Sequence, residues 1–98
     1  MNDPKTMQEV AVLMRQSLPA GISPSEFGER LAWGRGNDEA LERMKSLTVD
    51  ELAAIGLTSE AAMQWAWAYE TVGRLMPHNP SASGRAALMR HAAKLLKG

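Results

Sequence analysis

The sequence predicts an all-α fold, a compact orthogonal bundle of five or six helices that forms a single domain over residues 1–98. Three observations support this prediction. A chain of 98 residues is long enough for one domain and too short for two. Its apolar residues are mostly Ala, Leu and Met, which favour helices, whereas β-branched residues are few. Three segments have the spacing of an N-terminal capping box, in which a Ser or Thr precedes a Glu by three residues.

The first two helices are bounded by capping and breaking residues. The first is expected to begin after Thr6, because Thr6 and Glu9 have capping-box spacing, and to end at Leu18 before a proline. The motif Ser23-Pro24-Ser25-Glu26 begins the second helix, with its proline in the first helical turn. This helix ends at Gly34-Arg35-Gly36, which we interpret as a flexible interhelical turn.

Two shorter helices are expected in the middle of the chain. Asn37 or Asp38 begins the first of them. Thr48-Val49-Asp50-Glu51 is a further capping box and begins the second. Gly56 stands where the end of that helix needs a left-handed residue, so that Leu57 can close it as a Schellman motif.

Two long helices complete the chain. The first is capped by Thr58 or Ser59 and extends to about Met76, and the next is expected to begin at Asn79-Pro80 or Ser81. Steps of 100° place one broad apolar face of the first long helix toward the core: Ala61, Ala62, Trp65, Ala68, Tyr69, Val72, Leu75 and Met76. The predicted core of the whole domain is Val10, Leu13, Met14, Phe27, Leu31, Leu41, Met44, Leu52, Ile55, Trp65, Tyr69, Val72, Leu88, Leu95 and Leu96.

The composition excludes several classes of protein. There is no cysteine, which excludes disulfides and thiolate zinc sites. No stretch approaches the roughly 20 apolar residues that span a bilayer, so no membrane span is expected. Met1-Asn2-Asp3-Pro4-Lys5 does not have the pattern of a secretory signal. We therefore expect a cytoplasmic protein without a cofactor, with export by a route that needs no signal peptide as the alternative.

Two tryptophans lie outside the clearest core positions and are candidates for binding a partner. Trp67 and Met63 are nearly opposite the apolar face of the long helix. If exposed, they form a patch of the residue types that are enriched at interface cores, and burial of Trp67 under a neighbouring helix is the alternative. Trp33 precedes the glycine-flanked Arg35, which can also reach a partner. The predicted partner-binding residues are therefore Trp33, Arg35, Met63 and Trp67.

Charge is unevenly placed along a chain whose net charge is zero. Residues 71–98 contain five basic residues and no acidic one. The structural explanation is that cations near a helix C-terminus complement its dipole and solvate its outer face. The functional explanation is a surface that binds an anion (nucleic acid, lipid headgroups or an acidic partner) through Arg74, Arg85, Arg90, Lys94 and Lys97.

Other motifs in the chain are weaker. Residues 51–62 look like a helix-turn-helix and also resemble a helix-hairpin-helix, but Glu60 stands where both families place basic or neutral donors, so we interpret the corner as a packing feature. His78 and His91 are thirteen residues apart, which does not suit a helical metal pair. We predict no catalytic and no metal-binding residue, while a metal-free ribonuclease using His91, Arg90 and Lys94 is the enzymatic alternative.

Three segments taken together resemble a known family. They are residues 33–37, the corner from Leu47-Thr48 to Gly56-Leu57-Thr58 with Trp65, and residues 79–82 with Arg85 and Leu88-Met89. The resemblance covers residues 23–97 and is to a small helical bacterial domain of unknown function, often found near the C-terminus of polymorphic-toxin or secretion-associated proteins. It implies a bacterial context and carries over no catalytic residues.

The leading functional hypothesis is a non-enzymatic protein-interaction module, an effector or adaptor of a bacterial secretion or mobile-element system. It rests on the lack of a catalytic motif, the additional tryptophans and the one-sided charge. The alternatives are a nucleic-acid-binding protein that uses the basic C-terminal helix and a small antibacterial toxin. The expected partner is a protein, with nucleic acid or a second copy of the chain as alternatives.

Overall fold

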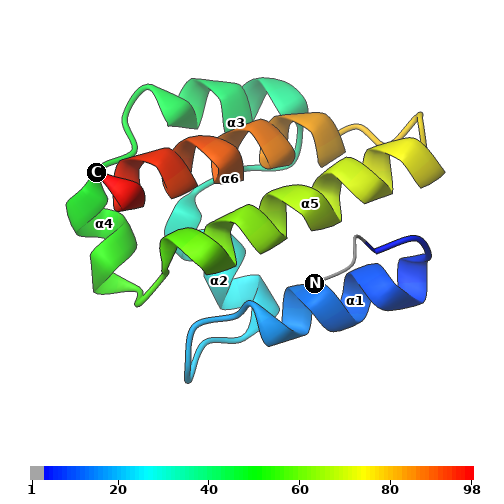
Figure 1. Ribbon diagram of the computed structural model, residues 1–98. Helices are drawn as coiled ribbons and strands as arrows, with labels where there is room; N and C mark the ends of the chain where they lie inside the picture. Colours follow the sequence, from blue (N-terminus) through cyan, green and yellow to red (C-terminus); the bar gives the residue numbers. More distant parts are fainter. Residues whose placement is uncertain (1–3) are drawn as a thin grey trace.

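The computed structural model describes residues 4–98, which form six helices and no strand (Figure 1). The all-α prediction is confirmed. The first three residues of the segment considered for a signal peptide lie outside the described residues. No helix in the described part of the chain is long and apolar enough to cross a membrane. The helices are α1 (Met7–Gln16), α2 (Pro24–Leu31), α3 (Asn37–Met44), α4 (Val49–Ala54), α5 (Ser59–Leu75) and α6 (Ala82–Lys97).

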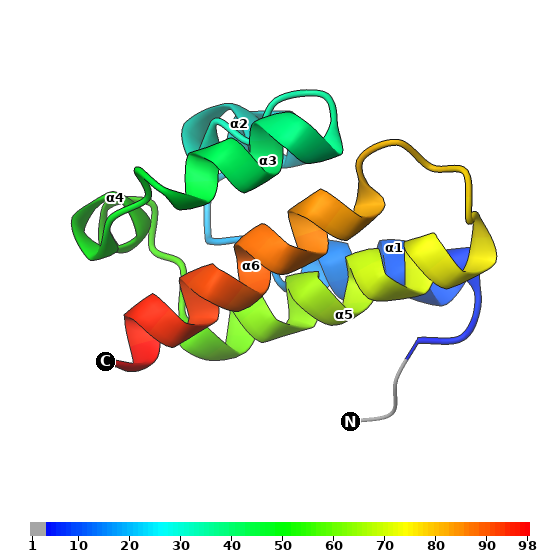
Figure 2. The same cartoon turned by 90° about the horizontal axis from the view of Figure 1, so that it is seen from above.

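The two longest helices, α5 and α6, form an antiparallel pair at the centre of the fold (Figure 1). Helix α1 packs on α5, and α3 packs on α6. Helix α4 crosses the C-terminal end of α6 and is seen nearly end-on in Figure 2. Because α5 and α6 run in opposite directions, the N-terminal half of α5 lies beside the C-terminal half of α6.

Four helices begin at the predicted caps. The side chains of Thr6, Ser23, Thr48 and Thr58 each accept the backbone N–H three residues further along, at 3.1–3.2 Å. Only the box at Thr48 is complete, because Glu51 accepts the Thr48 N–H in return at 3.1 Å. The other two expected boxes are half formed, since Glu9 accepts the N–H of Lys5 and Glu26 pairs with Arg30.

The C-terminal end of α4 and the start of α6 are fixed by two different capping interactions. Gly56 has a φ of +80°, and Leu57 donates its N–H to the carbonyl of Leu52 at 3.2 Å, which confirms the predicted Schellman closure. The side chain of Asn79 accepts the N–H groups of Ser81 and Ala82 at 3.0 and 2.9 Å, so Asn79 caps α6 from outside the helix.

Four aromatic rings form the centre of the core. Phe27 stacks on Trp65 with ring centroids 4.6 Å apart and meets the edge of Trp33 at 5.7 Å. Trp33 in turn makes an edge contact with Tyr69 at 5.5 Å. The indole N–H of Trp65 donates to the carbonyl of Ser17 at 3.0 Å, so the buried ring is satisfied. The aromatic cluster therefore joins α2, the turn after it and α5.

Three predicted core residues are wrong. Leu41, Leu75 and Met76 are 46%, 44% and 47% exposed. Leu41 lies on the outer side of α3, whose buried face carries Ala40 instead. Leu75 and Met76 lie at the end of α5 that extends beyond the start of α6 (Figure 1). The other predicted core residues are buried or packed against the core.

Arg43 joins three consecutive helices through one guanidinium group. Its Nε donates to the carbonyl of Leu31 at the end of α2 at 2.8 Å, and its Nη2 lies 2.6 Å from Oε2 of Glu51 on α4. The Arg43 side chain is 12% exposed, whereas that of Glu51 is 46% exposed. The hydrogen bonds from Arg43 and Thr48 hold the pKa of the Glu51 carboxyl below its usual range.

Because this pKa is lowered on folding, Glu51 stabilises the fold at a pH above its unfolded value, and this contribution is lost as the pH falls through the folded value. We expect Arg43→Gln to move the Glu51 pKa upward, as measured by the pH dependence of its carboxyl ¹³C resonance. Lys45→Gln, which removes the exposed pair with Glu42, is the matched control and should leave the Glu51 titration unchanged. An unchanged titration in Arg43→Gln would contradict the assignment of the shift to Arg43.

Candidate functional site

A groove of about 960 Å³ lies between the N-terminal half of α5 and the C-terminal half of α6. It is lined by Ser59, Glu60, Met63, Gln64 and Trp67 of α5 and by Arg90, Ala93, Lys94 and Lys97 of α6. The antiparallel pairing of the two helices, visible in Figure 2, brings these residues together. It places two of the predicted partner-binding residues beside three of the predicted anion-binding ones.

Met63 and Trp67 form the apolar part of the groove. They are four residues apart and therefore lie on the same face of α5. Met63 packs in part against the main core, and Trp67 packs in part against the cluster that contains Val10 and Leu13 of α1. Both side chains are half-buried, so each is held in place by the core and still presents surface to the groove.

Cations predominate on the α6 side of the groove. Arg90 forms an ion pair with Glu70 of α5 that joins the two helices. Lys94 and Lys97 are exposed and have no ion pair within residues 4–98. Glu60 lies across the groove on α5, and it is the acidic residue that lines it. The α6 side of the groove therefore has two lysines that are free to pair with an incoming carboxylate.

Polar contacts fix the base of the groove. The hydroxyl of Ser59 donates to the carbonyl of Ala93 at 3.0 Å, which ties the start of α5 to α6. The side-chain oxygen of Gln64 accepts the hydroxyl of Ser17 at 2.7 Å, which ties α5 to the end of α1. The backbone on both sides of the groove is therefore held in register before any partner binds.

The five predicted anion-binding residues do not form one surface. Arg90, Lys94 and Lys97 line the groove, but Arg74 lies in the last turn of α5, where its guanidinium donates to the Thr71 hydroxyl at 2.9 Å. Arg85 lies over the ring of Trp33, with its Cζ 4.6 Å from the ring centroid. Arg74 and Arg85 therefore do not extend the cationic side of the groove, and Arg85 faces the aromatic core instead.

The expectation that Trp33 is free to bind a partner is also wrong. Trp33 is only 7% exposed and belongs to the aromatic cluster. Gly28 makes this burial feasible, because a Cβ at that position would lie 2.7 Å from Nε1 of the Trp33 indole. Gly28, in the second helix five residues before Trp33, is the feature of the sequence that could have indicated the burial of this tryptophan. Arg35 is exposed on the following turn, away from the groove residues.

The histidines are not brought together. His78 is exposed in the turn after α5, and His91 is half-buried on α6. Within residues 4–98, no group of three or more His, Cys, Asp or Glu side chains is placed to hold a metal ion.

A family model described as a domain of unknown function (DUF4951) matches residues 2–96. Because this match spans nearly the whole sequence, the chain belongs to the DUF4951 family. Neither the comparison with curated proteins nor the comparison with solved structures gave a match.

Proposed function

We propose that this DUF4951 domain is a non-enzymatic protein-interaction module whose α5–α6 groove binds a segment of a partner protein with apolar and acidic side chains. The observation that carries the proposal is the position of half-buried Trp67 and Met63 beside the unpaired Lys94 and Lys97. The resemblance described above suggests a bacterial secretion or mobile-element system as the setting, in which the domain acts as an adaptor or effector.

The chemistry of the groove favours this kind of partner. Trp and Met are enriched at the centres of protein interfaces, where large side chains lose their remaining contact with water. A partner side chain that covers Trp67 and Met63 gains this apolar contact. Acidic residues of the same segment then meet Lys94 and Lys97, which supports specificity and the association rate more than raw affinity.

Nucleic acid suits the same surface less well. A phosphate backbone binds through a series of cations, each of which displaces a counterion. Here Arg74 and Arg85 lie outside the groove, and Arg90 is already paired with Glu70. Glu60 adds a negative charge within the groove. The surface therefore has a short basic footprint beside apolar side chains, which favours a protein partner over nucleic acid.

The proposal predicts that Trp67→Ala weakens partner binding by about 2 kcal/mol, or roughly 30-fold in Kd, the size of an interface hot spot. The protein should be immobilised and exposed to a nuclease-treated bacterial lysate, and the Kd of a protein that it retains should then be measured with the purified variants. The double variant Lys94→Glu/Lys97→Glu should weaken the same complex, mainly through slower association.

Matched controls separate binding from folding. Val12→Ala removes a 45% exposed side chain of α1 outside the groove, and Arg35→Glu reverses an exposed charge elsewhere. Neither should change the Kd. The lysine variants remove no core contact, so they test the groove even if Trp67→Ala lowers stability. The proposal would be refuted if no groove substitution changed the Kd of the complex. It would also be refuted if the immobilised protein retained only nucleic acid from an untreated lysate.

A further inference from the structure

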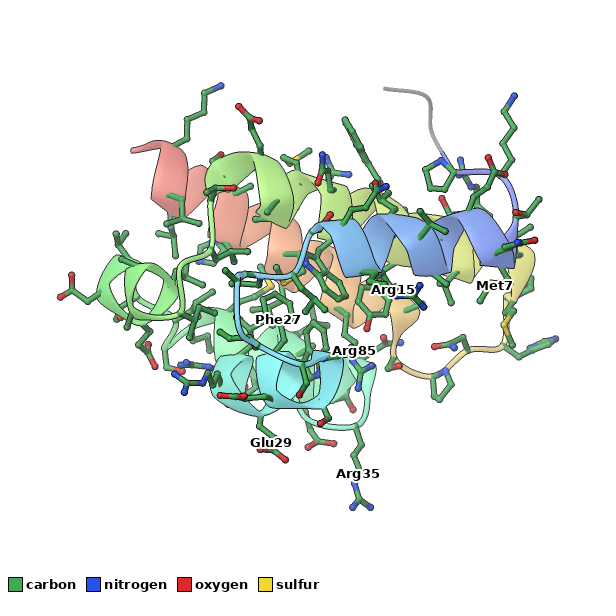
Figure 3. All side chains as sticks on the ribbon, turned by 90° about the horizontal axis from the view of Figure 1, so that it is seen from below. Met7, Arg15, Phe27, Glu29, Arg35 and Arg85 are labelled. Atoms are coloured by element: carbon green, nitrogen blue, oxygen red, sulfur yellow. The ribbon has the colours of Figure 1, made fainter. Side chains whose placement is uncertain are left out.

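A second hollow, of about 510 Å³, lies between α2 and the turn that follows it. Ser25 and Gly28 of α2, Trp33 and Arg35 of the turn, Tyr69 of α5 and Arg85 of α6 are among the residues that line it. In Figure 3, Arg85 points into the space between α2 and the rest of the bundle, while Arg35 and Glu29 extend outward. The residues of the α5–α6 groove take no part in this hollow.

The guanidinium of Arg85 is held firmly but is only partly satisfied. Its Nη2 donates to the carbonyl of Gly34 at 2.9 Å, and its Nη1 makes a long hydrogen bond of 3.4 Å to the Tyr69 hydroxyl. Its Nε is buried and has no hydrogen-bond partner. A guanidinium has five N–H groups in a planar fork, so each Nη atom retains one N–H without a hydrogen-bond partner in residues 4–98.

The charge of Arg85 also lacks a counterion within residues 4–98. No carboxylate lies within ion-pair distance of it. Burial raises the pKa of Tyr69, so its phenol remains neutral and does not balance the charge. The rings of Trp33 and Tyr69, with centroids 4.6 and 5.7 Å from Cζ, replace part of the lost hydration by cation–π attraction. Taking a charge out of water without a counterion is costly, so the buried part of this guanidinium favours a bound anion.

Acidic residues are near the hollow but do not pair with Arg85. Glu39 accepts the backbone N–H of Arg35 at 3.2 Å and so stabilises the turn rather than Arg85. Glu29 lies at the edge of the hollow. The fold thus fixes a cation on an aromatic platform at an open surface and leaves two of its donor groups available.

We propose that this hollow is a binding site for a single oxyanion, a carboxylate or a phosphate, held by the Nη groups of Arg85. A planar fork of parallel N–H groups matches the two oxygens of either group. The Ser25 hydroxyl at the edge of the hollow supplies a further donor, and the exposed Arg35 can close over the bound anion. Glu29 repels a dianion more than a monoanion, so the carboxylate is expected to bind more tightly than phosphate. The site is independent of the α5–α6 groove.

The test is an NMR titration of ¹⁵N-labelled protein with sodium acetate and, separately, with sodium phosphate, at ionic strength held constant with sodium chloride. We expect saturable shifts of the Arg85 Nε–H, the Trp33 indole N–H and the Gly34 amide. The backbone amide of Val12 on α1, which lines neither the hollow nor the α5–α6 groove, is the internal control and should not respond. Saturation by acetate at lower concentration than by phosphate identifies a carboxylate site, and the reverse order identifies a phosphate site. Shifts that remain linear in both anions, or that the Val12 amide shares, overturn the proposal.

Two variants test whether the anion binds in the hollow. Arg85→Lys keeps the charge but loses the fork, and affinity is expected to fall by about tenfold. Glu29→Gln alters only an exposed residue at the edge, so it leaves the core intact, and affinity should rise by about two- to fivefold because a like charge is removed. Unchanged affinity in Glu29→Gln, together with full binding by Arg85→Lys, places the anion elsewhere and overturns the proposal.

Discussion

Phe27→Ala is expected to lower the free energy of unfolding by about 3–5 kcal/mol, the usual cost of removing a buried aromatic side chain. Phe27 is 0% exposed and lies between Trp65, on which it stacks, and the edge of Trp33. Its loss leaves a cavity at the point where α2, the turn after it and α5 meet. A chain of this length has a total stability of roughly 5–15 kcal/mol, so the variant will lose a large part of it.

Urea denaturation followed by circular dichroism measures this effect, with stability taken from the midpoint and slope of the transition. Leu41→Ala is the matched control. The sequence places Leu41 in the core, but the side chain is 46% exposed, and its removal should change stability by no more than about 0.5 kcal/mol. If Leu41→Ala cost as much as Phe27→Ala, the outward orientation of this face of α3 would be wrong.

Gly84→Ala is expected to destabilise the fold by about 1–3 kcal/mol, the usual cost of an overpacked contact. In an exposed helix interior the same change stabilises by about 0.5–1 kcal/mol, because alanine is the better helix former. At position 84 the tertiary contact reverses the sign. A Cβ there would lie 2.6 Å from Cα and 2.8 Å from the carbonyl oxygen of Asn37, which are backbone atoms that cannot move aside alone.

The contact between α3 and α6 explains why moving these helices apart to make room for the methyl group costs stability. The Gly84 N–H donates to the side-chain oxygen of Asn37 at 2.8 Å, and the Asn37 N–H donates to the carbonyl of Pro80 at 3.0 Å. Moving α3 away to accommodate a methyl group weakens both bonds. They also hold the turn that carries Trp33 against the first turns of α6, so the Arg85 hollow should be disturbed in this variant while the α5–α6 groove is retained.

Gly73→Ala provides the matched control on the neighbouring helix. A Cβ at position 73 would meet only the Ala82 side chain at 3.9 Å, which is an ordinary contact. Thermal and urea unfolding should therefore show Gly73→Ala to be as stable as the natural chain or up to about 1 kcal/mol more stable. Equal effects of the two substitutions would mean that helix propensity, not the approach of α3, decides the role of Gly84.

Two of the three segments that carry the family resemblance, residues 33–37 and residues 79–85, meet in space through these contacts. Asn37, the first residue of α3, binds the start of α6, and Asn79 caps that helix. Arg85 of α6 donates to the carbonyl of Gly34 in the turn after α2. These residues are far apart in the sequence and meet where the turn after α2 packs against the start of α6.

Only the residues that each helix contributes to the candidate site could be predicted from the sequence. Helical spacing correctly grouped Met63 with Trp67, and separately Arg90 with Lys94 and Lys97, because each group lies on one helix. That the two groups face the same groove depends on the antiparallel pairing of α5 with α6. Arg85 lies on another side of α6 from the three cationic residues of the groove and faces Trp33.

By itself the sequence determined where four of the helices begin, whereas the predicted end of the second helix at Gly34 is wrong, because α2 ends at Leu31 and Ala32 adopts a left-handed conformation. The caps at Thr6, Ser23, Thr48 and Thr58 act over three residues, so the information is local and can be read directly. Only the tertiary structure decided which apolar faces are covered. Trp33 is buried and Leu41 exposed because burial depends on helices that are distant in the sequence, and amphipathic spacing specifies a face but not the surface that packs against it.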